Sequence, residues 1–204
     1  MTQSAVPASN ASPAPNLALG YAAALGTVAI WAGFILISRL GGKAALTGWD
    51  IVALRLGTAA IILLPFSLKL PAGTWRSPRL WTLALIGGLA FLVLAYAGFK
   101  LAQAAHGGIL IPGMQPFLIT ALAWAMLGTR PTRQRVLSLM PIALGVACVA
   151  FPVISGLGHG PSTLMGDALL LGASIAWAIY SVLVKKWVHD PWLLTRFVAL
   201  ASAA

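Results

Sequence analysis

Charged residues are scarce in this sequence, and acidic residues are almost absent. Only 8% of the 204 residues are charged, there is no glutamate, and the three acids are Asp50, Asp167 and Asp190. A soluble domain carries about 25% charged residues, so this chain lacks the polar surface that a water-soluble fold requires. The mean hydropathy of +0.93 agrees with this interpretation. The composition therefore predicts an integral membrane protein.

Residues that carry enzymatic or metal chemistry are also few. The single cysteine, Cys148, stands in an apolar run and can form no disulfide within the chain. The sequence contains no cluster with metal-ligand spacing and no phosphate-binding glycine loop, so we expect no metal, no cofactor and no ATP-driven pumping by this chain. Ser155 and His159 resemble part of a hydrolase site, but no third residue orients them. We therefore expect the protein not to be an enzyme.

Long apolar runs, in contrast, fill most of the chain. A membrane-spanning helix needs roughly 20 mostly apolar residues. Six runs approach or reach that length, separated by charges, proline and glycine: 17–38, 51–68, 80–99, 107–129, 136–154 and 168–184. A seventh run begins near Trp192, and residues 1–16 have the composition of a flexible tail. We predict an all-α, polytopic bundle of transmembrane helices.

Basic residues outnumber acidic ones by 13 to 3, which gives a net charge of +10. They stand in small groups between the apolar runs, and short cytoplasmic loops collect Lys and Arg, so membrane topology is favoured over nucleic-acid binding. With the N-terminus inside, the inside loops hold eight: Lys69, Arg76, Arg79, Arg130, Arg133, Arg135, Lys185 and Lys186. The outside loops hold Arg39, Lys43 and Lys100. We predict a multi-pass protein of the inner (plasma) membrane with a cytoplasmic N-terminus, embedded in lipid and binding no nucleic acid.

The sequence also repeats itself over a long interval. Residues 25–39 (LGTVAIWAGFILISR) and 171–185 (LGASIAWAIYSVLVK) share four identities in fifteen positions, and an arginine enters the next helix in both copies, as Arg55 and Arg196. Five spans per repeat is an odd number, so the second copy must be inverted, as in many secondary transporters. We predict a first five-helix repeat over 17–154, a loop over 155–165 and the start of an inverted second repeat over 166–204.

Four segments carry a resemblance to a known family. They are IWAGFILISR around Trp31, LRLGTAAIILLP around Arg55, the fourth run AAHGGILIPGMQPFLITALAWAMLG, and QRVLSLMPIALGVACVA after it. From about Leu17 to Val153 the chain resembles the EamA branch of the drug/metabolite transporter superfamily. The resemblance implies ten spans in two repeats, and the family usually has a glutamate after the fourth span, where this sequence has Thr129.

The length of the chain departs from that family pattern. The sequence stops within its seventh run, so it looks like a truncated transporter or a fragment of a longer one. On that interpretation, we expect residues 1–204 alone not to complete a transport cycle.

Arg55 is the sharpest candidate for a solute-binding residue. An arginine inside a span is costly unless it is paired or hydrated, so it either lines a polar cavity for an anionic or zwitterionic solute, or it reaches the outer interface or caps a neighbouring helix. Trp31 and Trp177 are repeat-related and lie near the middle of their spans. They either face each other across the pseudo-two-fold axis and stack on a flat or cationic solute, or they serve ordinary helix packing.

The fourth span contains two prolines, Pro112 and Pro116, with Gly108 and Gly113 close by. Each proline frees a backbone carbonyl, which the membrane tolerates only beside a polar neighbour or a water-filled cavity. Gln115 lies between the prolines and adds a polar side chain. We interpret this segment as a kink that lines a cavity, with a simple packing bend as the alternative.

Tyr96, Gln103 and His106 cluster where the third span meets the fourth. We expect this histidine to be solvated at the interface, although its charge can change near neutral pH. No carboxylate lies well inside a predicted span, so the usual acidic proton relay is absent from this part of the sequence.

These observations together predict a secondary transporter that moves small metabolites, amino acids or drugs by alternating access. We expect five residues to converge on one polar cavity near the membrane midplane: Trp31, Arg55, Tyr96, Gln115 and Trp177. A second copy of the chain is a further candidate partner. The alternatives are a membrane fragment without transport activity, or an intramembrane enzyme.

Overall fold

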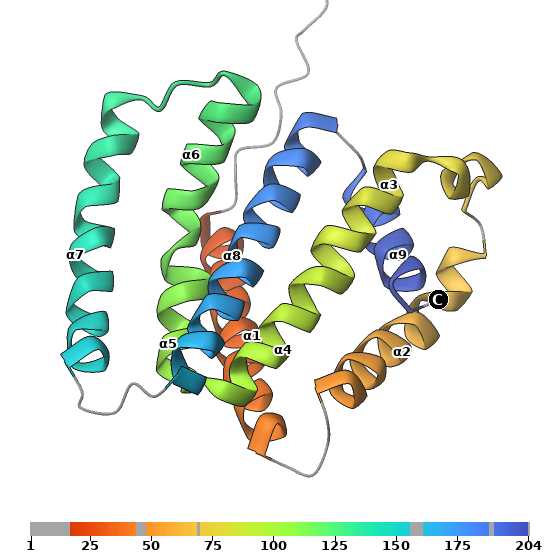
Figure 1. The fold of residues 1–204 in the computed structure, drawn as a ribbon. Coiled ribbons are helices and arrows are strands. Elements are labelled where there is room, and N and C mark those ends of the chain that lie inside the picture. The colour runs from red at the N-terminus through yellow and green to blue at the C-terminus, as the bar shows by residue number, and fades with distance from the viewer. Residues whose placement is uncertain (1–16, 44–47, 69, 156–160, 188–189, 204) are drawn as a thin grey trace, which may run out of the picture. The chain divides into compact units, whose positions relative to one another are not determined.

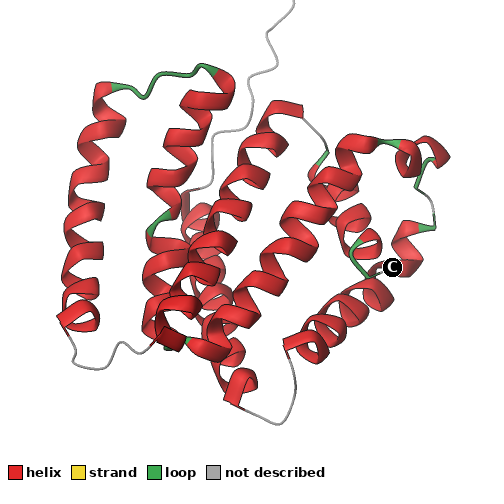
Figure 2. Ribbon diagram, viewed as in Figure 1, coloured by secondary structure: helices red, strands yellow, loops and turns green. Residues whose placement is uncertain are grey.

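The computed structural model describes residues 17–43, 48–68, 70–155, 161–187 and 190–203. In these ranges the chain forms helices joined by turns and short loops, without strands (Figures 1 and 2). The longer helices are α1 (Leu17–Lys43), α2 (Gly48–Ser67), α4 (Phe91–Leu101), α6 (Gln115–Leu127), α7 (Arg133–Ser155), α8 (Pro161–Trp187) and α9 (Pro191–Ala201). The prediction of an all-helical bundle is confirmed.

Shorter helical pieces complete two of the spans. The third span begins with α3 (Pro78–Leu83), continues through the π-helical η2 (Ala84–Ala90) and ends with α4. The fourth consists of α5 (Ala104–Gly108), the π-helical η3 (Ile109–Gly113) and α6. A 3₁₀ turn, η1 (Ala72–Arg76), precedes α3.

Five helices of the described chain are long and apolar enough to cross a membrane. Their spans are Leu17–Ile37, Trp49–Ser67, Pro78–Leu101, Ala104–Leu127 and Ser162–Trp187. They coincide with the first four and the sixth of the predicted runs. The predicted fifth run, 136–154, corresponds to α7, which has 23 residues but is not among these five. The predicted tail and residues 156–160 of the predicted 155–165 loop lie outside the described residues, whereas 161–165 form the first turns of α8 and not a loop.

The chain divides into two compact units, residues 1–34 and 35–204. The described part of the first unit is the N-terminal part of α1, whose large apolar side chains are exposed, Leu19, Leu25 and Ile30 among them. An apolar helix surface of this kind suits a lipid or protein environment and not water. Within this unit, the rings of Trp31 and Phe34 make an edge-to-face contact with centroids 5.7 Å apart.

The centre of the second unit is the pair formed by α4 and α8, which run antiparallel. Near one end, a Cβ on Gly98 would lie 2.7 Å from Cγ of Leu170. Further along, the Phe91 and Trp177 rings are in contact, with centroids 4.9 Å apart. Small residues let helix backbones approach closely where no hydrophobic effect drives association. The glycine therefore fixes the close packing of these two helices.

A second contact joins α9 to α2 and α3. Leu194 and Phe197 of α9 are buried in a cluster with Leu80 and Leu83 of α3 and Leu183 of α8. Trp192, near the start of α9, meets Phe66, near the end of α2, in an edge-to-face contact of 6.0 Å. Arg196 Nη1 donates to the carbonyl of the same Phe66 at 2.8 Å. The N-terminal end of α9 therefore lies against the C-terminal end of α2.

Candidate functional site

Arg55 and Tyr96 are two of the predicted site residues, and the structure brings them together. Arg55 lies two turns into α2, and Tyr96 lies in the middle of α4. The guanidinium Nη1 of Arg55 donates to the Tyr96 hydroxyl at 3.4 Å. Tyr96 is buried, whereas the Arg55 side chain is exposed. The contact therefore holds one amino group of the Arg55 guanidinium, while the rest of this side chain is exposed on α2.

Trp177 lies at the middle of α8 in an aromatic cluster. Its ring contacts Phe91 on α4 and, at 5.2 Å, Tyr180 one turn further along α8. The Tyr180 ring in turn fills the space beside Gly87, where any Cβ would collide with it. Trp31, the other tryptophan predicted for the site, belongs to the other compact unit, where its ring contacts Phe34.

The fourth span is irregular around Pro112, as its sequence predicts. The π-helical segment Ile109–Gly113 is followed by a turn at Met114 before α6 resumes. The polar groups released there meet α8: the Ser174 hydroxyl donates to the Ile111 carbonyl at 3.4 Å. Gln115 Nε2 donates to the Ser174 carbonyl at 3.0 Å and to its hydroxyl at 3.2 Å. Ser174 is fully buried, so the described partners at this kink are groups on a neighbouring helix.

The remaining residues predicted for the kink in the fourth span have different surroundings. A Cβ on Gly113 would lie 3.2 Å from Val146 of α7, whereas a Cβ on Gly108 would meet nothing within 4 Å. The hydroxyl of Thr120 donates to the carbonyl of Pro116 at 2.6 Å. The Oε1 atom of Gln115 is buried without a hydrogen-bond partner in the structure. Unsatisfied polar atoms of this kind are costly, and they mark places where water or a ligand binds.

His106 and Asp167 form a contact that the sequence did not reveal. Asp167 lies inside α8, because this helix starts at Pro161, seven residues before the predicted run. His106 Nδ1 is 2.6 Å from Asp167 Oδ1, with the two side chains 5% and 25% exposed. The expectation that His106 is solvated was therefore wrong, since its side chain is buried against Asp167 near the start of the α8 span. The run was delimited by its apolar residues, so the polar first turns of α8 were left out of it. For this reason the pair was missed.

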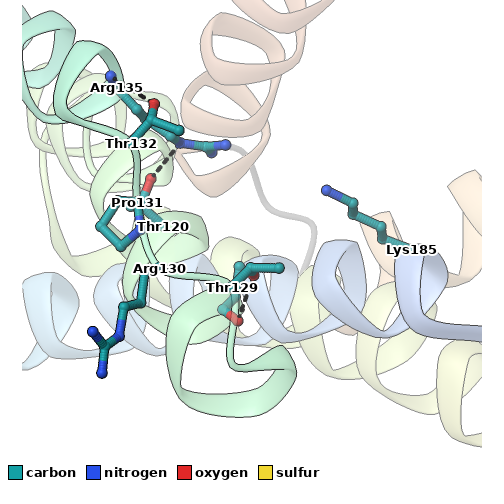
Figure 3. A pocket seen from close by; sticks show the side chains of 8 residues that line it. Thr120, Thr129, Arg130, Pro131, Thr132, Arg135 and Lys185 are labelled. Carbon is teal, nitrogen blue, oxygen red and sulfur yellow. Dashed lines mark hydrogen bonds between the residues drawn. The ribbon is translucent and has the colours of Figure 1, made fainter.

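A cavity of about 160 Å³ lies at the other end of the spans, beside the loop between α6 and α7. Its lining includes three cations, Arg130, Arg135 and Lys185 (Figure 3). The guanidinium of Arg135 and the ammonium of Lys185 point toward the space between them, whereas Arg130 points away (Figure 3). None of these three was a predicted site residue, because each was assigned to loop charge that sets membrane orientation.

The family of the chain follows from a match to a family model. Residues 18–151 match the model of the EamA-like transporter family. The chain belongs to this family. The matched range covers the first four spans and most of α7, and it includes Arg55, Tyr96 and Gln115. The family resemblance inferred from the four sequence segments is thereby confirmed.

Two known proteins show the same likeness to this EamA-like chain. The "Uncharacterized transporter YyaM" of Bacillus subtilis (strain 168) is 31% identical over 111 residues, which are 53% of this chain and 35% of YyaM. A solved structure titled "Crystal structure of protein" superimposes with a TM-score of 0.61 at 21% identity, covering 90% of this chain and 64% of the solved chain. The chain thus spans about a third of the length of YyaM. The structural likeness supports the helical fold.

Proposed function

We propose that this EamA-like chain forms part of a secondary carrier for small metabolites, amino acids or drugs that works by alternating access. Family membership supports a transporter, and YyaM carries that description in its printed name. On this proposal the N-terminus is cytoplasmic, the membrane is the inner (plasma) membrane, and 17–154 and 166–204 are related by inversion. The contact of α9 with the C-terminal end of α2, the helix to which the repeat relates it, supports this arrangement.

The observation that carries the proposal is the Arg55–Tyr96 contact on the facing sides of α2 and α4. Placing a guanidinium within a membrane span costs free energy unless its surroundings are polar, and such residues mark solute or ion pathways. The Tyr96 hydroxyl at 3.4 Å orients one edge of the guanidinium, and a guanidinium donates paired hydrogen bonds to a carboxylate. We therefore infer that Arg55 binds the carboxylate or another anionic group of an anionic or zwitterionic solute.

The proposed cavity extends from this pair toward Trp177 and Gln115. Phe91 lies five residues before Tyr96 on α4, about 7.5 Å along the helix axis at 1.5 Å per residue, and it contacts Trp177. Gln115 reaches Ser174, one turn before Trp177 on α8. The guanidinium of Arg55, the ring of Trp177 and the amide of Gln115 thus lie in succession beside α4 and α8.

Transport assays on the protein in reconstituted vesicles test this proposal. We expect saturable uptake of at least one amino acid or small organic anion that empty vesicles do not show. Arg55→Gln removes the charge, and because hydrogen bonds to charged groups contribute about 1.5–3 kcal/mol, we expect a roughly 10- to 100-fold loss of apparent affinity. Tyr96→Phe removes the orienting hydroxyl and should weaken binding less.

Tyr180→Phe is the matched control, since this ring packs against Gly87 and Trp177. It should leave the apparent affinity within about twofold of the starting protein, because the tested change is again one hydroxyl. Equal flux from Arg55→Gln and the unmodified protein would refute the assigned site. Absence of saturable flux across the solute panel, together with hydrolysis of a substrate, would favour the enzyme alternative.

A further inference from the structure

The cavity between the α6–α7 loop and α8 has the composition of an anion site. It combines two inward-pointing cations, Arg135 and Lys185, with threonine side chains and a volume of about 160 Å³. Neither cation has a carboxylate partner among the described residues. Two like charges facing one small cavity repel each other, so a bound anion would remove an unfavourable interaction as well as add favourable ones.

Hydrogen bonds within the chain orient Arg135 for this purpose. Its Nε donates to the Thr120 hydroxyl at 3.1 Å, and that hydroxyl donates onward to the Pro116 carbonyl. Thr120 is buried, so the bond holds the Nε edge of the guanidinium against α6. The two terminal amino groups then point into the cavity, in the forked arrangement that binds two phosphate oxygens at once.

The backbone beside the cavity adds to its positive electrostatic potential. The helix α7 begins at Arg133, beside the cavity, and helix N-termini carry partial positive charge. The Thr132 hydroxyl accepts from the Arg135 backbone N–H at 3.2 Å and so fixes this helix start. Arg130, from the preceding loop, lines the wall without pointing inward. Two segments that are far apart in sequence, residues 120–135 and Lys185 of α8, therefore contribute to one electropositive cavity.

We propose that this cavity binds a phosphate group, and that its occupant is the headgroup phosphate of an anionic phospholipid. The size argues against a whole metabolite, since small-molecule sites usually have volumes of about 300–1,000 Å³. The location argues for lipid: the loop 128–132 and the last turn of α8 end their spans, where headgroups lie. Basic pockets between transmembrane helices bind acidic headgroups. The proposal is independent of the solute that the carrier moves.

Thermal unfolding of the purified protein in a neutral detergent tests the site. We expect phosphatidylglycerol to raise the midpoint, and phosphatidylcholine at equal concentration to leave it unchanged. Each basic residue near a membrane surface contributes about 1 kcal/mol to anionic-lipid binding, so the double change Arg135→Gln and Lys185→Gln should weaken phosphatidylglycerol binding roughly 30-fold. The affinity is read from the dependence of the midpoint on lipid concentration.

Two neighbouring cations outside the cavity supply the matched control. Arg133→Gln with Lys186→Gln removes the same charge from the same two helices, yet neither residue lines the cavity. This control should retain the phosphatidylglycerol response to within about threefold. An equal loss in both double variants would show general charge attraction and overturn the site. Inorganic phosphate raising the midpoint as much as the lipid would overturn the lipid assignment.

The single variant Lys185→Gln distinguishes a loss of lipid binding from a loss of stability. Arg135 has an internal hydrogen bond that its replacement removes, whereas no internal bond of Lys185 is found in the described structure. The single variant should therefore keep its unfolding midpoint without lipid and still bind phosphatidylglycerol several-fold more weakly. An unchanged lipid affinity in this variant would contradict the proposal.

Discussion

Three residue pairs make polar contacts between neighbouring helices of the described bundle. Arg55 with Tyr96, Gln115 with Ser174, and His106 with Asp167 each join two different helices. In hydrocarbon, a polar side chain without a partner costs several kcal/mol. These pairs therefore decide which helix faces can meet, in addition to any part that they play in solute binding.

At the residue scale, we predict that the His106–Asp167 contact stabilises the fold. Breaking a fully buried ion pair costs about 3–5 kcal/mol, and the 25% exposure of Asp167 reduces our expectation for Asp167→Asn to about 2 kcal/mol. His106→Gln should cost a similar amount. In a double-mutant cycle, the two changes should be coupled by about 1–2 kcal/mol, measured from unfolding in detergent.

Asp190→Asn is the control for this cycle. The Asp190 carboxylate caps α9 by accepting from the Leu193 backbone N–H at 2.7 Å, and asparagine caps helices about as well as aspartate. The control should change the free energy of unfolding by less than about 0.5 kcal/mol. Additive effects of His106→Gln and Asp167→Asn would show that the pair contributes no net coupling.

At the scale of elements, the antiparallel α4–α8 pair is the part on which the other helices assemble. The close approach at Gly98 and Gly166 brings the two backbones together, with a Cβ on Gly98 only 3.0 Å from the Gly166 carbonyl oxygen. Helix α7, in contrast, exposes most of its apolar side chains, such as Leu137 and Leu144. A surface of this kind needs lipid, another part of the carrier or a second copy of the chain to cover it.

We predict that Gly98→Ala destabilises the α4–α8 pair. The new methyl group would lie 2.7 Å from the Leu170 side chain and close to a backbone oxygen that cannot move away easily. Overpacking of this kind costs about 1–3 kcal/mol. The measurement is the unfolding midpoint in detergent, with a fall of several degrees expected.

Gly145→Ala on α7 is the matched control, because a Cβ there meets nothing within 4 Å. Alanine is the better helix former by up to about 1 kcal/mol, so the control should be neutral or slightly stabilised. A Gly98→Ala protein as stable as the Gly145→Ala protein would contradict the close packing of α4 and α8.

At the scale of the whole molecule, the helix order fixes which loops share a side of the membrane. If all of α1, α2, α3–α4, α5–α6, α7 and α8 span the membrane, residues 68–77, 128–132 and 188–190 lie on one side. These three segments and the adjoining helix ends hold eight of the 13 basic residues. The positive-inside rule then assigns this side to the cytoplasm, and the proposed phosphate site lies on it.

We predict that Ser77 is cytoplasmic and Ser162 faces the opposite side. Single changes Ser77→Cys and Ser162→Cys, in a Cys148→Ser background because Cys148 is exposed, place one thiol on each side. A membrane-impermeant maleimide added to intact cells should label only the Ser162→Cys protein, and permeabilised cells should show labelling of both. Ser77 makes no side-chain cap to α3, so its replacement should not disturb the helix. Labelling of Ser77→Cys in intact cells would reverse the orientation.

The sequence by itself determined that the protein is helical, where most spans lie, and which family it belongs to. These properties are local: a bilayer demands about 20 apolar residues per span, so composition alone marks the helices, and Pro112 alone marks the break in the fourth one. Arg55 and Tyr96 were both identified as candidates in this way. The start of α8 was misplaced, because the polar first turns around Asp167 resemble a loop.

Only the tertiary structure decided which polar groups meet. The contacts Arg55–Tyr96, Gln115–Ser174 and His106–Asp167 join residues 41, 59 and 61 positions apart. Such contacts depend on the rotation and register of packed helices, which the close approach at Gly98 sets and which no local pattern records. For the same reason, the sequence alone does not relate Arg135 to Lys185, whereas in the fold both residues line one cavity.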